Sequence, residues 1–68
     1  MFPIIQDHIV IPITPLQDYN IPISKCDNME KVLGWVIHLL EKSWVTKEII
    51  DKFIQTALNH HNLNRPQV

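Results

Sequence analysis

The sequence predicts an α+β protein in which an N-terminal extended segment, interrupted by prolines or folded as a loose β-hairpin, packs on a C-terminal αα-hairpin. Residues 1–24 hold four of the five prolines and show the alternation of apolar and polar side chains that is typical of strands. Residues 28–61 hold no proline and repeat apolar side chains at the spacing of an amphipathic helix. A chain of 68 residues is long enough for one domain, so we interpret the two regions as parts of a single small domain.

The first extended element is predicted at residues 8–14. Ile9, Ile11 and Ile13 share one face of a strand, because side chains alternate with a period of two residues. Pro12 has no backbone N–H, so it removes a hydrogen-bond donor from the middle of one flank. We therefore expect this strand to lie at a sheet edge or to pair on one flank only. A strand added by a partner is expected on the flank that remains able to pair.

A second extended piece is predicted in the stretch YNIPIS, residues 19–24. Ile21 and Ile23 share one face of it, and Pro22 again removes one backbone donor. The stretch TPLQD, residues 14–18, reads as a turn because it contains proline and aspartate. Together the two extended pieces are predicted to form a loose hairpin that lies over the helices.

The first helix is predicted at about residues 28–43. Asp27, followed three residues later by Glu30, has the form of a capping box at its start. On a helical wheel the apolar arc spans roughly 200°, with Trp35 at one side and Ile37 at the other, which is wider than one neighbouring element covers. The stripe within this arc consists of Met29, Val32, Leu33, Val36, Leu39 and Leu40.

The second helix is predicted at about residues 47–61. Thr46 is a favourable N-cap, and Glu48 places a negative charge in the first turn, where the helix dipole favours it. A short connection of about three or four residues predicts that the two helices form an αα-hairpin. Residues 64–68 are polar, contain a proline and are expected to fray. The apolar side chains of the second helix are Ile49, Ile50, Phe53, Ile54, Ala57 and Leu58.

The charge balance argues against two classes of partner. Six lysine and arginine residues against seven aspartate and glutamate residues give a formal charge of −1, so no broad positive field attracts nucleic acid or an anionic membrane. No apolar run approaches the roughly 18 residues of a membrane helix. One cysteine, Cys26, cannot form an internal disulfide, which is typical of a reducing compartment. We therefore expect a cytoplasmic protein that makes no contact with a membrane.

No metal site, cofactor or catalytic site is predicted. His60 and His61 are adjacent and diverge by about 100° on a helix, and Cys26 and the other histidines lie far apart in the sequence, unlike the ligands of a zinc site. The serines and threonines stand in no motif that would supply a base and an oxyanion hole. Gly34 is the only glycine, so a glycine-rich phosphate loop is excluded. We expect no enzymatic activity.

Association is predicted because both helices carry more apolar surface than a two-helix hairpin covers. Trp44 is interpreted as a core residue, whereas Trp35 either belongs to the core or anchors a partner at the side of the arc. We expect a non-enzymatic protein-interaction module, a homodimer that buries its helical hairpins against each other and acts as a modulator or inhibitor of a larger protein. The residues predicted to bind partners are Ile11, Ile13, Trp35, Ile37, His38, Ile54 and Leu58.

Other interpretations remain open at this point. Small chains without enzymatic motifs are frequent among products of phages and other mobile elements, so inhibition of a host system is a reasonable subclass. A subunit that folds stably only inside a larger assembly would have a similar sequence. The alternative function is that of a small helix-turn-helix regulator, whose second helix enters the major groove of DNA. That helix exposes acidic and basic residues in nearly equal number, so nucleic acid is the less favoured partner: Lys47, Glu48, Asp51, Lys52 and Gln55.

Overall fold

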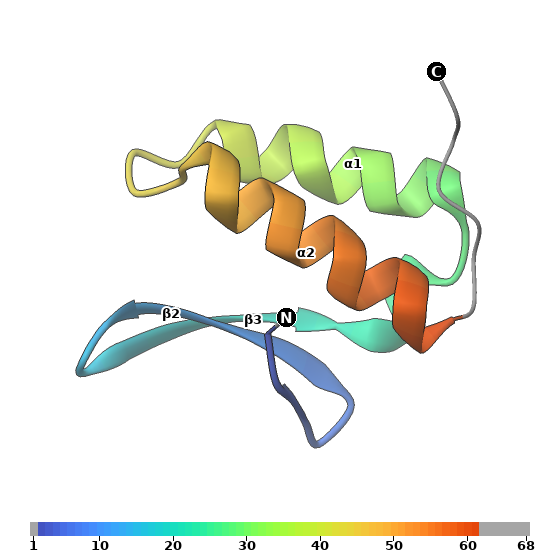
Figure 1. Ribbon diagram of the computed structural model, residues 1–68, viewed down its shortest axis with the longest axis horizontal. Helices are drawn as coiled ribbons and strands as arrows, with labels where there is room; N and C mark the ends of the chain where they lie inside the picture. Colours follow the sequence, from blue (N-terminus) through green and yellow to red (C-terminus); the bar gives the residue numbers. More distant parts are fainter. Residues whose placement is uncertain (1, 62–68) are drawn as a thin grey trace.

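The computed structural model describes residues 2–61 and has two layers, a three-stranded antiparallel sheet and two helices that cover one of its faces (Figure 1). The predicted α+β class is therefore confirmed. The tail expected at residues 64–68 lies outside the described residues. None of the helices within residues 2–61 is long and apolar enough to cross a membrane. In chain order the elements are β1 (Ile4–Ile5), β2 (His8–Thr14), β3 (Gln17–Pro22), the 3-10 helix η1 (Ile23–Cys26), α1 (Met29–Leu40) and α2 (Lys47–His60).

The strand β2 lies in the centre of the sheet, in the order β1-β2-β3, so the prediction that it is an edge strand was wrong. The short strand β1 pairs only with the start of β2, through the pairs Ile4 with Ile9 and Ile5 with His8. At Pro12, which lies beyond the end of β1, the strand pairs with β3 alone. Within residues 2–61 no strand lies on that flank, so the missing N–H leaves no ladder hydrogen bond unmade there. The flank that we expected a partner to fill is occupied by β3.

The core lies between the helices and the facing side of the sheet. Ile9 and Ile11 of β2 are fully buried there, as the alternation of the sequence predicts, and Ile21 of β3 pairs with Ile9 on the same face. Phe53 on α2 is the largest fully buried side chain among residues 2–61. The hairpin of β2 and β3 and its packing on the helices therefore follow from one apolar face per strand. The buried core cluster contains Ile9, Ile11, Ile21, Ile23, Cys26, Val32, Leu39, Phe53 and Ala57.

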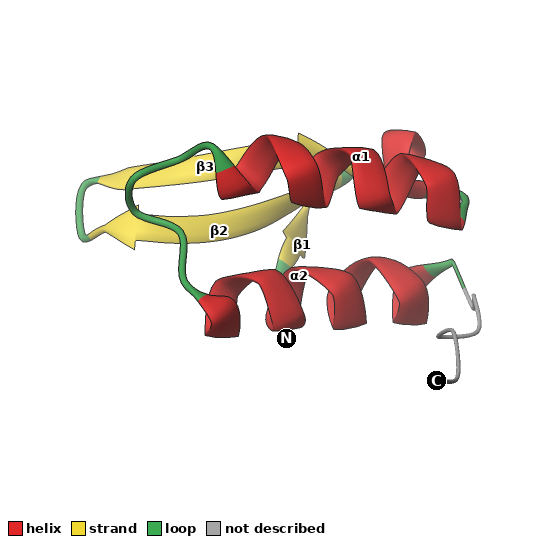
Figure 2. Cartoon of the chain, turned by 90° about the horizontal axis from the view of Figure 1, so that it is seen from above, coloured by secondary structure: helices red, strands yellow, loops and turns green. Residues whose placement is uncertain are grey.

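The two helices run side by side in opposite directions over the sheet, with residues 41–46 between them (Figure 2). Helix α2 begins where predicted, and the Thr46 hydroxyl accepts a hydrogen bond from the backbone N–H of Ile49 at 3.2 Å. Helix α1 ends at Leu40, three residues before the predicted end. In the connection that follows, Trp44 packs on Tyr19 of β3, with a ring separation of 5.4 Å.

The capping box predicted at Asp27 was wrong. Asn28 is the N-cap of α1, and its side-chain oxygen accepts a hydrogen bond from the backbone N–H of Lys31 at 2.9 Å. Asp27 instead forms an ion pair with the amine of Lys31 at 3.0 Å, which lowers the pKa of the Asp27 carboxyl. Asp27 and Asn28 are adjacent, and both residue types are favourable N-caps, so the sequence pattern alone favoured the wrong one of the two.

The turn between β1 and β2 stores backbone strain that a substitution can relieve. Gln6 and Asp7 both have positive φ, 51° and 62°, as the two central residues of a type I′ hairpin turn require. Since residues with a side chain adopt this conformation at a cost of roughly 1–2 kcal/mol, asparagine and glycine fit better. We expect the double variant Gln6→Asn/Asp7→Gly to raise the free energy of unfolding by about 1–2 kcal/mol in urea titrations.

The other hairpin turn supplies the control for this prediction. Leu16 is almost fully exposed and does not have positive φ. Leu16→Gly therefore relieves no strain and adds freedom to the unfolded chain, so it should not stabilise the protein. A double variant at Gln6 and Asp7 that is no more stable than Leu16→Gly would contradict the role assigned to the first turn.

Candidate functional site

Two surfaces of α1 stand out. The first, which we name the α1 stripe, consists of Leu33, Ile37 and Leu40. These side chains are 51%, 63% and 61% exposed, although each is a large aliphatic group. They follow the spacing i, i+4 and i+7 and therefore lie on one side of the helix. The core-facing residues Val32 and Leu39 of the same helix are fully buried. Helix α1 is thus apolar both where it packs and on an adjoining side that faces solvent.

The exposed side chains of the α1 stripe do not contribute their full free energy of burial to the stability of the monomer. Fully burying one such side chain is worth about 1.5–3 kcal/mol, and these three are buried by half or less. Single exposed apolar residues are ordinary on protein surfaces, but aligned groups mark sites of interaction. The wide apolar arc of the first helix indicated this excess in the sequence. It did not indicate which part of the arc would remain exposed.

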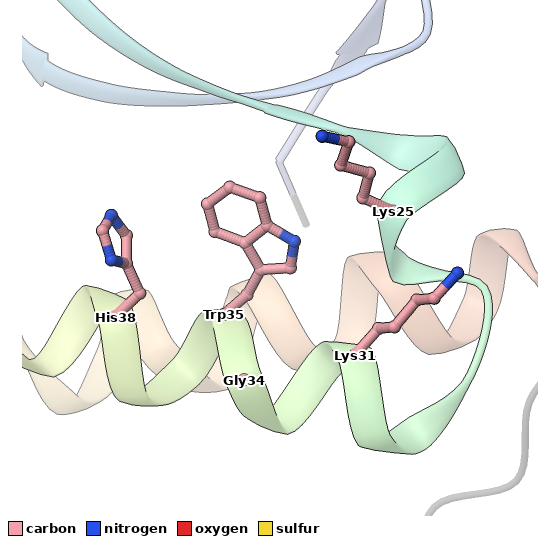
Figure 3. Close-up of a pocket in the computed structure, with 5 residues that line it drawn as sticks. All are labelled: Lys25, Lys31, Gly34, Trp35 and His38. Carbon is pink, nitrogen blue, oxygen red and sulfur yellow. The ribbon is translucent and has the colours of Figure 1, made fainter.

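The second surface, which we name the Trp35 groove, is an open hollow of about 540 Å³ beside α1, lined by Lys25, Lys31, Gly34, Trp35 and His38 (Figure 3). The rings of Trp35 and His38 meet edge to face at 5.6 Å between their centres. A Cβ atom on Gly34 would meet no atom within 4 Å, so the hollow is open on this side. The groove therefore combines one large aromatic surface with cationic groups at its margins.

The residues that the sequence predicted as partner-binding fall into three groups. Ile37 and His38 are exposed on α1, and Trp35 is half-buried against the core beside them. Ile11 and Leu58 are buried, so their side chains belong to the core and not to the surface of the monomer. Ile13 and Ile54 are partly buried, and Ile54 packs against the core. The structure thus brings Trp35 and His38 together in the Trp35 groove and places Ile37 on a different side of α1, in the α1 stripe.

Sequence reasoning missed five residues of these surfaces, of which one is Gly34. Leu33 and Leu40 were assigned to the packed stripe of the first helix, because helical spacing alone does not distinguish a packed side from an exposed one. Lys25 and Lys31 were not assigned to a site. Lys25 reaches the groove from η1, an element that has no clear periodicity in the sequence.

The described histidines and acidic residues do not gather into a metal site. Among residues 2–61, no group of three or more histidine, cysteine, aspartate or glutamate side chains is placed to hold a metal ion. The rings of His60 and His61 meet edge to face at 5.0 Å. The Nε2 atom of His61 lies 2.7 Å from the backbone carbonyl oxygen of Ile23, so this histidine connects the end of α2 to η1.

Cys26 is fully buried, and its thiol makes the free energy of unfolding fall at alkaline pH. Burial, with a smaller contribution from the negative charge of Asp27, raises the pKa of the Cys26 thiol from 9.0 to about 11. As the pH rises above 9, the unfolded chain loses the thiol proton while the folded chain keeps it. The stabilisation is therefore complete below pH 9 and is lost towards pH 11. We expect this thiol to lower the free energy of unfolding by roughly 2–3 kcal/mol over that range.

Urea titrations between pH 8 and pH 11 measure this effect. Other groups also titrate in that range, so the comparison is made with Cys26→Ala, which lacks the thiol and shares every other group. The difference in unfolding free energy between the two proteins should change across the window. An identical pH dependence would contradict the assignment. The Cys26 thiol donates to the backbone carbonyl oxygen of Pro22, at 3.7 Å from sulfur to oxygen.

The two surfaces together define the candidate site of the protein. The α1 stripe offers aliphatic contact area, and the Trp35 groove offers an aromatic surface with lysine and histidine around it. Both are suited to binding another macromolecule. In comparisons with models of known protein families, with curated proteins and with solved structures, the chain has no match.

Proposed function

We propose that the protein is a non-enzymatic protein-interaction module that forms a homodimer through the α1 stripe and acts as a modulator or inhibitor of a larger protein. The observation that carries this proposal is the exposure of Leu33, Ile37 and Leu40, more than half of each side chain. The hydrophobic effect favours any arrangement that removes these groups from water. A second copy of the same chain supplies an identical apolar surface at equal concentration.

A dimer with a twofold axis can bury all three side chains of the α1 stripe in one contact. The stripe extends from Leu33 to Leu40, about 10 Å along the helix at a rise of about 1.5 Å per residue. Ile37 lies near its middle, so a twofold axis through Ile37 places Leu33 of one copy against Leu40 of the other. Such an isologous contact is self-complementary and closed, so it gives a dimer and no larger assembly.

The small area of the α1 stripe limits the affinity that we expect for the dimer. A stable interface buries about 800 Å² per partner, and the solvent-accessible surface of one chain is 4886 Å². The stripe is a narrow part of that surface, and association itself costs at least about 4 kcal/mol. We therefore expect a dissociation constant in the micromolar range, about −8 kcal/mol or weaker.

Acidic residues beside the stripe give the dimer a characteristic salt dependence. On the helical wheel Glu30 and Glu41 lie next to Ile37, and the twofold axis directs Glu30 of one copy towards Glu41 of the other. Salt screens this repulsion and also strengthens the burial of apolar groups. The dimer is thus expected to tighten with increasing salt, whereas a contact built on ion pairs would weaken.

Sedimentation equilibrium of the full chain tests the proposal. Across protein concentrations from about 1 to 500 µM, which bracket the expected dissociation constant, the average mass should rise from that of one chain to that of two. The chain has a mass of 8.0 kDa, so the two limits are well separated. A folded protein that stays at 8.0 kDa throughout this range would overturn the homodimer.

No observation favours the alternative of a helix-turn-helix regulator. In that motif the two helices cross at about 90–120°, whereas α1 and α2 run side by side (Figure 2). The exposed surface of α2 carries Glu48 and Asp51 as well as Lys47 and Lys52. Carboxylates on this helix would face the phosphates of the groove, which disfavours binding.

A further inference from the structure

We propose that the free edge of β3 and the Trp35 groove together bind an extended acidic segment of a partner protein, which joins the sheet as a fourth strand. This inference rests on the proposal that the protein works by binding other proteins, and it names the chemistry of the larger partner. It uses a different surface from the α1 stripe. The homodimer and the strand addition can therefore succeed or fail independently.

The direction of the backbone groups in β2 shows which residues of β3 face outward. The backbone N–H of Val10 donates to a carbonyl oxygen just before β1 at 3.0 Å, so it points away from β3. Because alternate residues of a strand serve opposite flanks, Ile11 points towards β3. Its partner there is Tyr19, which consequently points back towards β2.

The residues on either side of Tyr19 therefore direct their backbone groups away from the sheet. Asp18 and Asn20 each present one N–H and one C=O at the edge, and among the described residues neither N–H has a hydrogen-bond partner outside the ladder of β2 and β3. Pro22 ends this stretch because it has no N–H. The edge offers room for a short added strand of about five to seven residues.

The other free flanks of the sheet are less suitable. The strand β1 contains two residues, Ile4 and Ile5, which is too short for stable pairing. The part of β2 beyond β1 contains Pro12, which interrupts the row of donors. An edge with outward N–H groups on two alternate residues, Asp18 and Asn20, is therefore found on β3.

The Trp35 groove lies along the same edge. Strand β3 is the outermost strand next to α1, and Figure 3 shows the side chains of Trp35 and His38 pointing from α1 towards it. Side chains of an added strand alternate between the two faces of the sheet. Those on the helix side would enter the groove of about 540 Å³, where an apolar group meets the ring of Trp35. Backbone pairing supplies affinity in this mode of recognition, and the side-chain hollow supplies specificity.

The charges around the groove select acidic side chains. Lys25 and Lys31 line it together with His38. Lys31 is already paired with Asp27 at 3.0 Å, whereas Lys25 has no ion pair within the described part of the chain. A carboxylate that enters the groove thus gains an unpaired ammonium group, and a lysine in the same place meets only like charge.

Synthetic peptides of seven residues test this inference. The probe Thr-Glu-Thr-Leu-Thr-Glu-Thr, with blocked ends, places leucine and two glutamates on the helix side when its threonines lie on the other side. Its binding to the full chain is followed by tryptophan fluorescence and by the amide shifts of Asp18 and Asn20 in NMR spectra. The counterpart with lysine in place of both glutamates should bind at least 10-fold more weakly. Equal affinity for the two would overturn the inference.

Backbone methylation separates strand addition from mere attraction of charge. In an antiparallel pairing, opposite residues share a face and exchange their hydrogen bonds, so the N–H groups of the two threonines that flank the leucine would point at β3. Methylating those two nitrogens should abolish binding, whereas methylating the nitrogens of the two glutamates should weaken it far less. If both methylated peptides bind as well as the parent, no strand is added. An oligonucleotide of the same charge that binds as tightly as the peptide would also contradict a peptide site.

A pair of charge reversals connects the effect to the groove. Lys25→Glu should weaken the acidic peptide at least 10-fold, while Lys47→Glu, an equal change of net charge on α2, should leave its affinity within 2-fold. Both variants should keep the sedimentation behaviour of the parent protein, since neither residue lies in the α1 stripe. Equal effects of the two reversals would show general attraction of charge and overturn the site. Peptide binding by a protein that remains monomeric would support the groove and reject only the homodimer.

Discussion

Phe53→Ala is expected to leave the protein largely unfolded at 25 °C. The side chain is fully buried and packs in the cluster formed by the sheet and both helices. Truncating a buried phenylalanine to alanine costs about 3–5 kcal/mol, through lost burial and the cavity that remains. A single core of this size supplies only about 3–5 kcal/mol of stability. One substitution thus removes most of the free energy of folding.

Circular dichroism during thermal and urea unfolding measures this loss. Leu16→Ala is the matched control, since it also truncates a large aliphatic or aromatic group to alanine, but at a position that is 98% exposed. The control should keep the unfolding midpoint of the parent protein. A Phe53→Ala variant with a cooperative transition at the same midpoint would mean that the core does not form around Phe53.

Ile37→Glu is expected to weaken the dimer by at least 100-fold. The substitution acts twice, because a twofold axis brings both copies of the residue into the interface. Each copy loses an apolar contact worth about 1–2 kcal/mol, and each places a carboxylate in a surface that the dimer buries. Since about 1.4 kcal/mol corresponds to a tenfold change, two copies give a factor of about 100 or more.

The same substitution should leave the monomer folded. The side chain of Ile37 is 63% exposed, so glutamate at this position faces water in a single chain. Leu16→Glu introduces the same charge at an exposed aliphatic residue outside the stripe and should keep the dimer within 2-fold of the parent. Sedimentation measures both constants. Equal dissociation constants for Ile37→Glu and the parent protein would place the contact elsewhere.

Much of the architecture could be predicted from local patterns. Alternation identified the face of β2 on which Ile9 and Ile11 are fully buried. Ile13, predicted on the same face, is only partly buried and lies where the register shifts between Pro12 and Thr14. The start of α2 followed from Thr46, whose hydroxyl caps the helix as expected. These features depend on one residue and its near neighbours in the chain, so a single sequence contains the information.

The errors arose where contacts distant in the sequence decide the outcome. The strand β1 is too short to show alternation and exists because β2 pairs with it through a tight turn at Gln6 and Asp7. The connection after α1 packs Trp44 against Tyr19, which lies 25 residues earlier in the sequence. Local propensity cannot anticipate either contact, since each requires the fold to be present already.

The candidate surfaces could also be predicted from the sequence only in part. The excess apolar width of α1 was visible in the sequence and drew attention to Ile37, which is exposed, and to Trp35, which is half-buried. The choice between Leu33 and Leu39 as exposed or buried depends on where α2 and the sheet lie, and helical spacing does not contain that information. The Trp35 groove needs η1 to bring Lys25 beside α1, so it could be found only from the fold.

Disulfide trapping at Ile37 tests the central claim, that two copies pair through the α1 stripe, most directly. Packed helices lie about 8–10 Å apart, and each Cα lies about 2.3 Å from its axis, which leaves about 3–6 Å between residues that meet at the axis. A disulfide needs about 4.4–6.8 Å between Cα atoms, so cysteine at position 37 can bond to its own copy. Under mild oxidation Ile37→Cys, in a Cys26→Ala background, should form a covalent dimer rapidly. Lys52→Cys, exposed on α2, should remain monomeric in the same background, and equal rates for the two would contradict the proposed pairing.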